Sequence, residues 1–168
     1  MTPLRMALGG ALLLAVALAP DSAPAQTPAK TPGPAPGQTQ GTVPTAAGRW
    51  KTIDDKTGAP RSVVVIEDKG GVFEGRIERI FFRPDETDTD PVCSKCTDAR
   101  KGHKTIGMTI LTGLKRDGLA YAGGEILDPG NGKVYRAKMT LSADGATLVV
   151  RGFIGFSLFG RSQTWLRE

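Results

Sequence analysis

The sequence has little of what most enzyme and metal sites use, because its 168 residues include one histidine and two cysteines. A Ser-His or Cys-His mechanism would depend on His103, which stands among basic residues with no supporting motif. Structural zinc prefers four Cys or His ligands, and Cys93, Cys96 and His103 supply three. We therefore expect no enzyme activity, cofactor or metal, and we nominate no catalytic residue.

Long apolar runs are also scarce, and the one that occurs lies at residues 6–19. It follows Arg5 and precedes the small-residue motif Ala23-Pro24-Ala25, the layout of a secretory signal peptide. The run is shorter than the roughly 20 residues that span a bilayer. We predict that residues 1–25 are a signal peptide, cleaved near Ala25, and that the protein is periplasmic or secreted.

Residues 26–47 lack charge and bulk: Lys30 is their only charged residue and Val43 their only sizeable apolar one. A Pro-, Thr-, Gly- and Ala-rich segment of this kind cannot bury enough apolar surface to offset its ordering entropy. We expect a disordered tether over residues 26–47, followed by one folded domain over residues 48–168.

The formal net charge is +5, but basic and acidic residues alternate along the domain rather than forming a basic stripe. Interleaved charges indicate a solvated surface with a mild preference for anionic partners such as membrane headgroups. No pattern of basic residues with interleaved aromatics, typical of nucleic-acid binding, is present. We expect no nucleic-acid partner, and the sequence leaves the oligomeric state open.

The domain also lacks a convincing amphipathic helix after residue 48. Short runs of alternating apolar and polar residues, separated by Gly, Asp, Asn and Pro, predict antiparallel strands instead. We expect strands near residues 49–53, 62–67, 72–82, 107–114, 119–127, 133–141, 147–153 and 162–167. Tight turns such as Asp68-Lys69-Gly70-Gly71 and Ala143-Asp144-Gly145 join consecutive strands as hairpins.

Period-two counting gives each strand one apolar and one polar side. Tyr135, Ala137, Met139 and Leu141 alternate with charged or hydroxyl residues. Eight strands with one apolar side can bury that side by closing into an up-and-down barrel, which also removes exposed edges. We predict such an all-β barrel, whose interior holds side chains or one small ligand.

The two cysteines form a Cys93-x-x-Cys96 motif in the one long loop, between Arg83 and Thr105. In an exported protein the pair predicts a structural disulfide that pins this loop. A thioredoxin-like redox pair is an alternative, but it needs a cysteine at a helix N-terminus. Acidic residues precede the motif and basic residues follow it, so we expect two oppositely charged arms rather than a calcium site.

Several stretches together resemble an uncharacterised family of exported bacterial proteins, domain of unknown function 2147. They are Gly48-Arg49-Trp50, Cys93-Ser94-Lys95-Cys96, residues 123–135 (GGEILDPGNGKVY) and residues 151–165 (RGFIGFSLFGRSQTW). The resemblance implies a lipocalin-like barrel without an established activity. It also implies that Arg167 closes over the first-strand Trp50, as in lipocalin-like proteins.

The stretch RGFIGFSLFGR, residues 151–161, allows three interpretations. Phe156 and Phe159 could plug one end of the barrel, gate a cavity whose carboxylate-binding residue is Arg151 or Arg161, or touch a membrane. If the barrel is hollow, the candidate ligand-binding residues are Phe73, Tyr121, Tyr135, Met139, Arg151, Phe153, Phe156, Phe159, Arg161 and Trp165. We expect a non-enzymatic protein that binds a small apolar or amphipathic ligand. The alternatives are a solid barrel that contacts an envelope partner and a thiol-redox protein.

Overall fold

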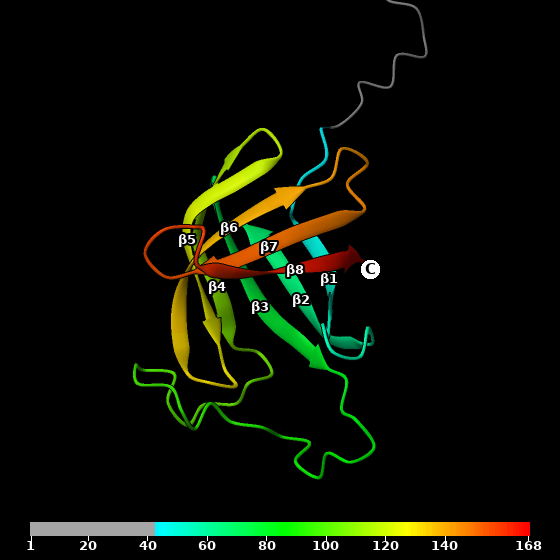
Figure 1. Cartoon of the computed structure of the whole chain (residues 1–168), viewed down its shortest axis with the longest axis vertical. Helices are drawn as coiled ribbons and strands as arrows, with labels where there is room; N and C mark the ends of the chain where they lie inside the picture. Colours follow the sequence, from blue (N-terminus) through cyan, green and yellow to red (C-terminus); the bar gives the residue numbers. More distant parts are fainter. Residues whose placement is uncertain (1–42) are drawn as a thin grey trace, which may run out of the picture. The chain divides into compact units, whose positions relative to one another are not determined.

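The computed structural model describes residues 43–168, so the expected signal peptide and most of the expected tether lie outside the described residues. Figure 1 shows the strands of the described part in chain order. They are β1 (Gly48–Ile53), β2 (Pro60–Asp68), β3 (Val72–Ile80), β4 (Thr109–Asp117), β5 (Ala120–Asp128), β6 (Lys133–Leu141), β7 (Thr147–Phe153) and β8 (Gly160–Arg167). Within residues 43–168 there is no helix that could span a membrane.

Each strand pairs antiparallel with its sequence neighbours, and β1 pairs with β8 to close the sheet into a barrel. At the closing seam Trp50 lies opposite Arg167, and Thr52 lies opposite Trp165. Every strand therefore has two partners, and the barrel presents no open edge to other chains. The prediction of an eight-stranded, antiparallel, up-and-down barrel is confirmed.

The alternation in the sequence matches the burial of side chains in the barrel. In β6 Ala137, Met139 and Leu141 are buried, whereas the intervening Arg136, Lys138 and Thr140 are exposed. β3 follows the same rule, with Phe73, Gly75 and Ile77 buried. Period two therefore identifies the core-facing side of these strands.

One end of the barrel is filled by large side chains and closed by the segment before β1. Phe73 and Tyr121 meet edge to face, with ring centroids 4.8 Å apart. The backbone N–H of Ala46 donates to the Tyr121 hydroxyl at 2.8 Å, and the Trp50 Nε1–H donates to the Ala46 carbonyl at 2.8 Å. Ala46 is fully buried, so residues 44–47, which we expected in a disordered tether, instead form part of the folded domain.

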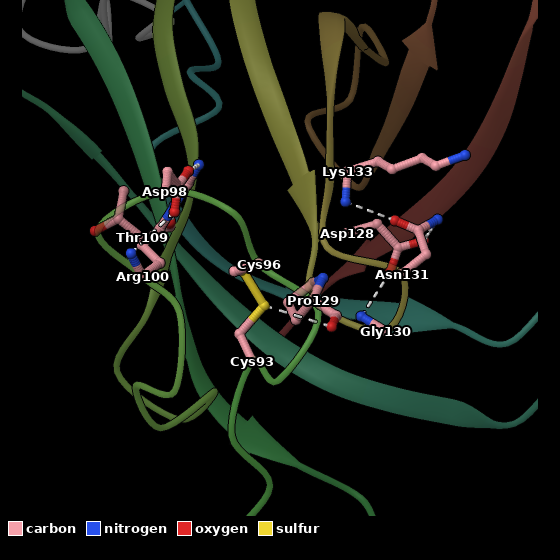
Figure 2. The surroundings of a disulfide bond; sticks show 10 residues. All are labelled: Cys93, Cys96, Asp98, Arg100, Thr109, Asp128, Pro129, Gly130, Asn131 and Lys133. Atoms are coloured by element: carbon pink, nitrogen blue, oxygen red, sulfur yellow. Dashed lines mark hydrogen bonds and ion pairs between the residues drawn. A yellow bond between two sulfur atoms is a disulfide. The ribbon is translucent and has the colours of Figure 1, made fainter.

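The long connection between β3 and β4 lies at the other end of the barrel. Its Cys93 and Cys96 are joined by a disulfide, as the sequence predicted. Figure 2 shows this disulfide beside the β5–β6 turn. The Cys93 Sγ lies 3.6 Å from the Pro129 carbonyl oxygen, a packing contact because a disulfide sulfur carries no proton.

A candidate ligand cavity in the open half of the barrel

The open half of the barrel contains a cavity of about 770 Å³. Its inner wall is apolar and includes Ile77, Ile110, Val150 and Trp165. Its mouth is surrounded by four chain segments: the β1–β2 turn, the long loop, the β5–β6 turn and the β7–β8 loop. The barrel is therefore solid at the Trp50 end and hollow at the other, with a volume in the range of small-molecule sites.

Two hydroxyl groups interrupt the apolar wall of this cavity. The Thr52 and Ser62 side-chain oxygens lie 2.8 Å apart, and the Ser62 backbone N–H donates to Thr52 Oγ1 at 3.1 Å. Across residues 43–168 no buried side-chain nitrogen or oxygen lacks a hydrogen-bond partner. The inner wall therefore presents no unsatisfied polar group, and it suits the apolar part of a ligand.

The mouth of the cavity is charged, and most of its charges are paired. Arg61 Nη1 lies 2.8 Å from Glu86 Oε2, and the pKa of Glu86 is lowered, chiefly by this hydrogen bond. Asp54 pairs with Arg83, and hydrogen bonding from the backbone N–H of Lys56 is the largest cause of its lowered pKa. Such pairs leave the mouth polar with little net charge.

Half of the expected ligand-binding residues lie along the cavity. Tyr135, Phe153, Phe159, Arg161 and Trp165 line it. Arg161 is at the mouth, where its Nε donates to Asp55 Oδ2 at 2.6 Å. Phe153 contributes only to the rim, because it is paired with the exposed Arg136 on the outer side of the sheet.

The other expected ligand-binding residues lie elsewhere. Phe73, Tyr121 and Met139 are buried in the solid half and do not belong to the cavity lining. Phe156 lies outside the cavity lining, and it and the rim residue Phe159 are 79% and 74% exposed, so the two rings do not form the buried plug that is one of the three interpretations. Their loop turns outward because its backbone is held on the outer side of the barrel.

Arg151 holds the loop in this position. Leu148 and Val150 are buried and Val149 is exposed, so Arg151 has the outward parity of β7. Its Nε donates to the Ser157 carbonyl at 2.7 Å and its Nη1 to Ser162 Oγ at 2.9 Å. Arg151 therefore positions the loop, and its donors do not face a ligand in the cavity.

The sequence interpretation missed Thr52, Ser62 and Gln163, which line the cavity. Thr52 is two residues after the inward Trp50, and Gln163 is two residues before the inward Trp165. Period-two counting from either tryptophan would have placed these polar residues inside. A polar residue at an inward position of a strand was the signal in the sequence that these residues could line a cavity.

The disulfide segment forms one wall of the mouth. Ser94 and Lys95 line the cavity, while Cys93 and Cys96 are buried. A Cβ atom at Gly132 would lie 2.0 Å from the Lys95 carbonyl oxygen, so the segment packs directly on the β5–β6 turn. Asp128 organises that turn by accepting hydrogen bonds from the Gly130 N–H and the Asn131 side chain (Figure 2).

One ion pair joins the acidic residues before the disulfide to the basic residues after it, whereas Glu86 pairs with Arg61 and Arg100 with Asp98. Lys104 Nζ lies 2.8 Å from Asp90 Oδ2, and Val92 and Lys104 form an isolated antiparallel bridge. Within residues 43–168, no group of three metal-ligating side chains is gathered. The two arms of the loop are held together chiefly by backbone hydrogen bonds, from the Cys93 N–H to the His103 carbonyl and from the Thr105 N–H to the Pro91 carbonyl.

The fold has a counterpart among solved structures, and the sequence matches a family model. A Helicobacter pylori protein, HP1028, described as belonging to the lipocalin family, superposes with a TM-score of 0.63 at 16% identity. The match covers 74% of this chain and 84% of that one. No functionally curated protein matches. Residues 48–167 match the model described as "Uncharacterized protein conserved in bacteria (DUF2147)". The chain therefore belongs to the DUF2147 family, and its domain is a lipocalin-like β-barrel.

Proposed function

We propose that this protein binds one small amphipathic molecule in the open half of its barrel. The observation that carries the proposal is the cavity of about 770 Å³, open at one end and closed below by the packed Trp50 end. A barrel filled throughout would have favoured a solid envelope-interaction protein. The hollow half supports ligand binding instead.

The residues that line the cavity determine how an amphipathic ligand is oriented in it. Ile77, Ile110 and Val150 present apolar surface inside, and the Thr52 and Ser62 hydroxyls already bond to each other. An apolar group therefore gains more from this inner region than a polar one, which would lose its hydration. The polar group of the ligand lies at the charged mouth, near Arg161 and Lys95.

We assign no catalytic role, and we propose that the disulfide is structural. A reactive cysteine is partly exposed and has a lowered thiol pKa, whereas both Cys93 and Cys96 are buried. The disulfide and the apolar run at residues 6–19 also support a periplasmic or secreted location, where a disulfide is stable.

Two measurements test ligand binding. Native mass spectrometry of protein purified from its own cells should show an adduct of small-molecule mass, which organic solvent removes. The stripped protein should then bind N-phenyl-1-naphthylamine with one-to-one stoichiometry and enhanced fluorescence. A protein that carries no adduct and does not enhance the probe would contradict the proposal.

A further inference from the structure

The loop between β7 and β8 exposes a group of large apolar side chains. Ile154, Phe156, Leu158 and Phe159 are 64%, 79%, 85% and 74% exposed, and residues 154–160 contain no charged residue. Isolated exposed apolar residues are ordinary, but four in one loop indicate an interaction surface. We call residues 154–159 the apolar loop.

Four carbonyl groups of the apolar loop are already hydrogen-bonded. The Phe159 N–H donates to the Phe156 carbonyl at 3.0 Å, and the Ile154 N–H donates to the Phe159 carbonyl at 3.1 Å. Arg151 donates to the two carbonyls between them, those of Ser157 (2.7 Å) and Leu158 (3.2 Å). Four successive carbonyls are thus satisfied within the protein.

The hydrogen bonds to these carbonyls favour lipid over protein as the partner of the loop. A backbone carbonyl that enters lipid without a hydrogen-bond partner carries a large desolvation cost. The internal bonds remove that cost for the carbonyl groups of residues 156–159, which makes it less unfavourable for the loop to leave water with its side chains outward. A protein partner could supply hydrogen-bond donors to the loop carbonyls, so it would not require them to be hydrogen-bonded within the loop.

The charges beside the apolar loop favour an anionic surface. On the outer side of the sheet Lys138 is paired with Arg151 and Arg136 with Phe153, and both β6 residues are exposed. Neither Arg136 nor Lys138 makes an ion pair within the described part of the chain. The carboxylate opposite Arg136 is Glu125, which offsets one of these cations. Positive charge beside an apolar insertion element strengthens binding to anionic lipid.

We propose that the apolar loop inserts into the interfacial region of an anionic phospholipid bilayer and docks the barrel on it. Ile154 and Phe159 belong both to the apolar loop and to the lining of the cavity. Insertion would therefore bring the cavity mouth to the lipid surface. The apolar loop would dock the barrel on the bilayer whether or not the cavity binds a ligand. Membrane docking and ligand binding are therefore tested separately.

The experiment uses residues 26–168, since the sheet closes within residues 48–167 and the apolar run at residues 6–19 would itself enter lipid. Phe156→Trp places an indole in the apolar loop, while Trp50 and Trp165 are buried. With phosphatidylglycerol and phosphatidylethanolamine vesicles, its emission should shift to the blue and be quenched by brominated acyl chains. An emission unchanged by vesicles would overturn the proposal.

Matched variants identify the contributions of the rings and of the cations. Phe156→Ser with Phe159→Ser should weaken vesicle partitioning about tenfold per ring. Val149→Ser with Leu166→Ser, which removes exposed apolar side chains from the barrel wall, should leave it unchanged. Arg136→Gln and Lys138→Gln should each weaken binding to anionic vesicles about fivefold and not affect phosphatidylcholine vesicles.

Two outcomes would assign the apolar loop to a different partner. Equal partitioning of the Phe and Val/Leu variants would show that the loop is not the lipid contact. A blue shift of the introduced indole that needs no vesicles and grows with protein concentration would show that a second copy covers the loop. Sedimentation of the Phe156→Trp protein without lipid separates that outcome from docking, which requires a monomer whose shift depends on vesicles.

Discussion

The guanidinium carbon of Arg167 lies 4.2 Å from the centroid of the Trp50 ring, over one face of the indole. The same guanidinium donates hydrogen bonds to the carbonyl oxygens of Gly145, Thr45 and Ala47. Arg167 therefore joins three segments: β1, the turn before β7 and the segment that closes the barrel end. The resemblance to lipocalin-like proteins implied this pairing.

Arg167→Ala should lower the free energy of unfolding by about 2 kcal/mol or more. The change removes the cation–π contact and three charge-assisted hydrogen bonds, although partial exposure reduces their value. Urea denaturation followed by tryptophan emission measures the loss. Arg76→Ala is the control, because exposed Arg76 is an ordinary surface position and should change stability by less than about 0.5 kcal/mol. Equal effects of the two changes would refute the role of Arg167 in joining these three segments.

Gly48→Ala should destabilise the barrel more than Gly70→Ala. Both glycines have positive φ, of 137° and 71°, but a Cβ at Gly48 would lie 2.6 Å from Arg167 Nη1, and one at Gly70 meets no atom within 4 Å. Gly70→Ala should cost roughly 1 to 2 kcal/mol from backbone strain alone. Gly48→Ala adds displacement of Arg167. Thermal unfolding of both variants gives the difference, and similar melting temperatures would contradict it.

Val150→Phe should weaken ligand binding strongly without unfolding the protein. Val150 lines the cavity, so the larger ring occupies space that the ligand needs. Val149→Phe is the matched control, because Val149 is the neighbouring residue on the outer side of β7 and is already exposed. Titration with N-phenyl-1-naphthylamine should show at least about tenfold weaker binding for Val150→Phe only. Equal binding by both variants would place the probe outside the cavity.

Replacing Cys93 and Cys96 with serine should cost about 2 kcal/mol, since the disulfide closes a short ring. The barrel itself should persist, because the pairings that close the sheet use no residue of the long loop. Far-UV circular dichroism should be unchanged, and amide exchange at Gly102, whose N–H donates to the Cys93 carbonyl, should accelerate. A lost barrel spectrum would show that the disulfide is required for the fold.

Stability should fall with pH below about 4. Hydrogen bonds from Arg100, first its side chain and then its backbone, lower the pKa of Asp98 from 3.8 to about 2. A carboxyl with a lowered folded-state pKa stabilises the protein above its unfolded pKa and loses this contribution as pH falls through the folded value. Urea midpoints measured from pH 6 to pH 2 should therefore decline, and Asp98→Asn should flatten the decline. An unchanged slope would refute this role for Asp98.

Local patterns predicted most of the barrel because each strand obeys a local rule. Alternation places Phe73 and Ile77 of β3 on one side regardless of what covers them, and glycine-containing turns join consecutive strands. Closure follows, since an apolar side must be buried and edges must be paired. The same rule also predicts that polar residues such as Thr52 face inward. Our candidate cavity residues were mostly aromatic and did not include Thr52.

The orientation of Phe156 and Phe159 could not be predicted from the sequence in the same way. A loop has no period, so its direction depends on which groups hold its backbone, and here Arg151 bonds to its carbonyls from the outer side of β7. The docking of residues 44–47 likewise needs Tyr121 and Trp50 to meet, although they are far apart in the chain.

The amino-acid order alone determined the strands, their inward sides, the hairpin connections and the cysteine pair, because these depend on residues within a few positions of one another. Tertiary structure decided that the barrel is solid at one end and hollow at the other, and that the apolar loop faces solvent. Those features depend on how side chains from distant strands share one interior, and no local pattern records that sharing.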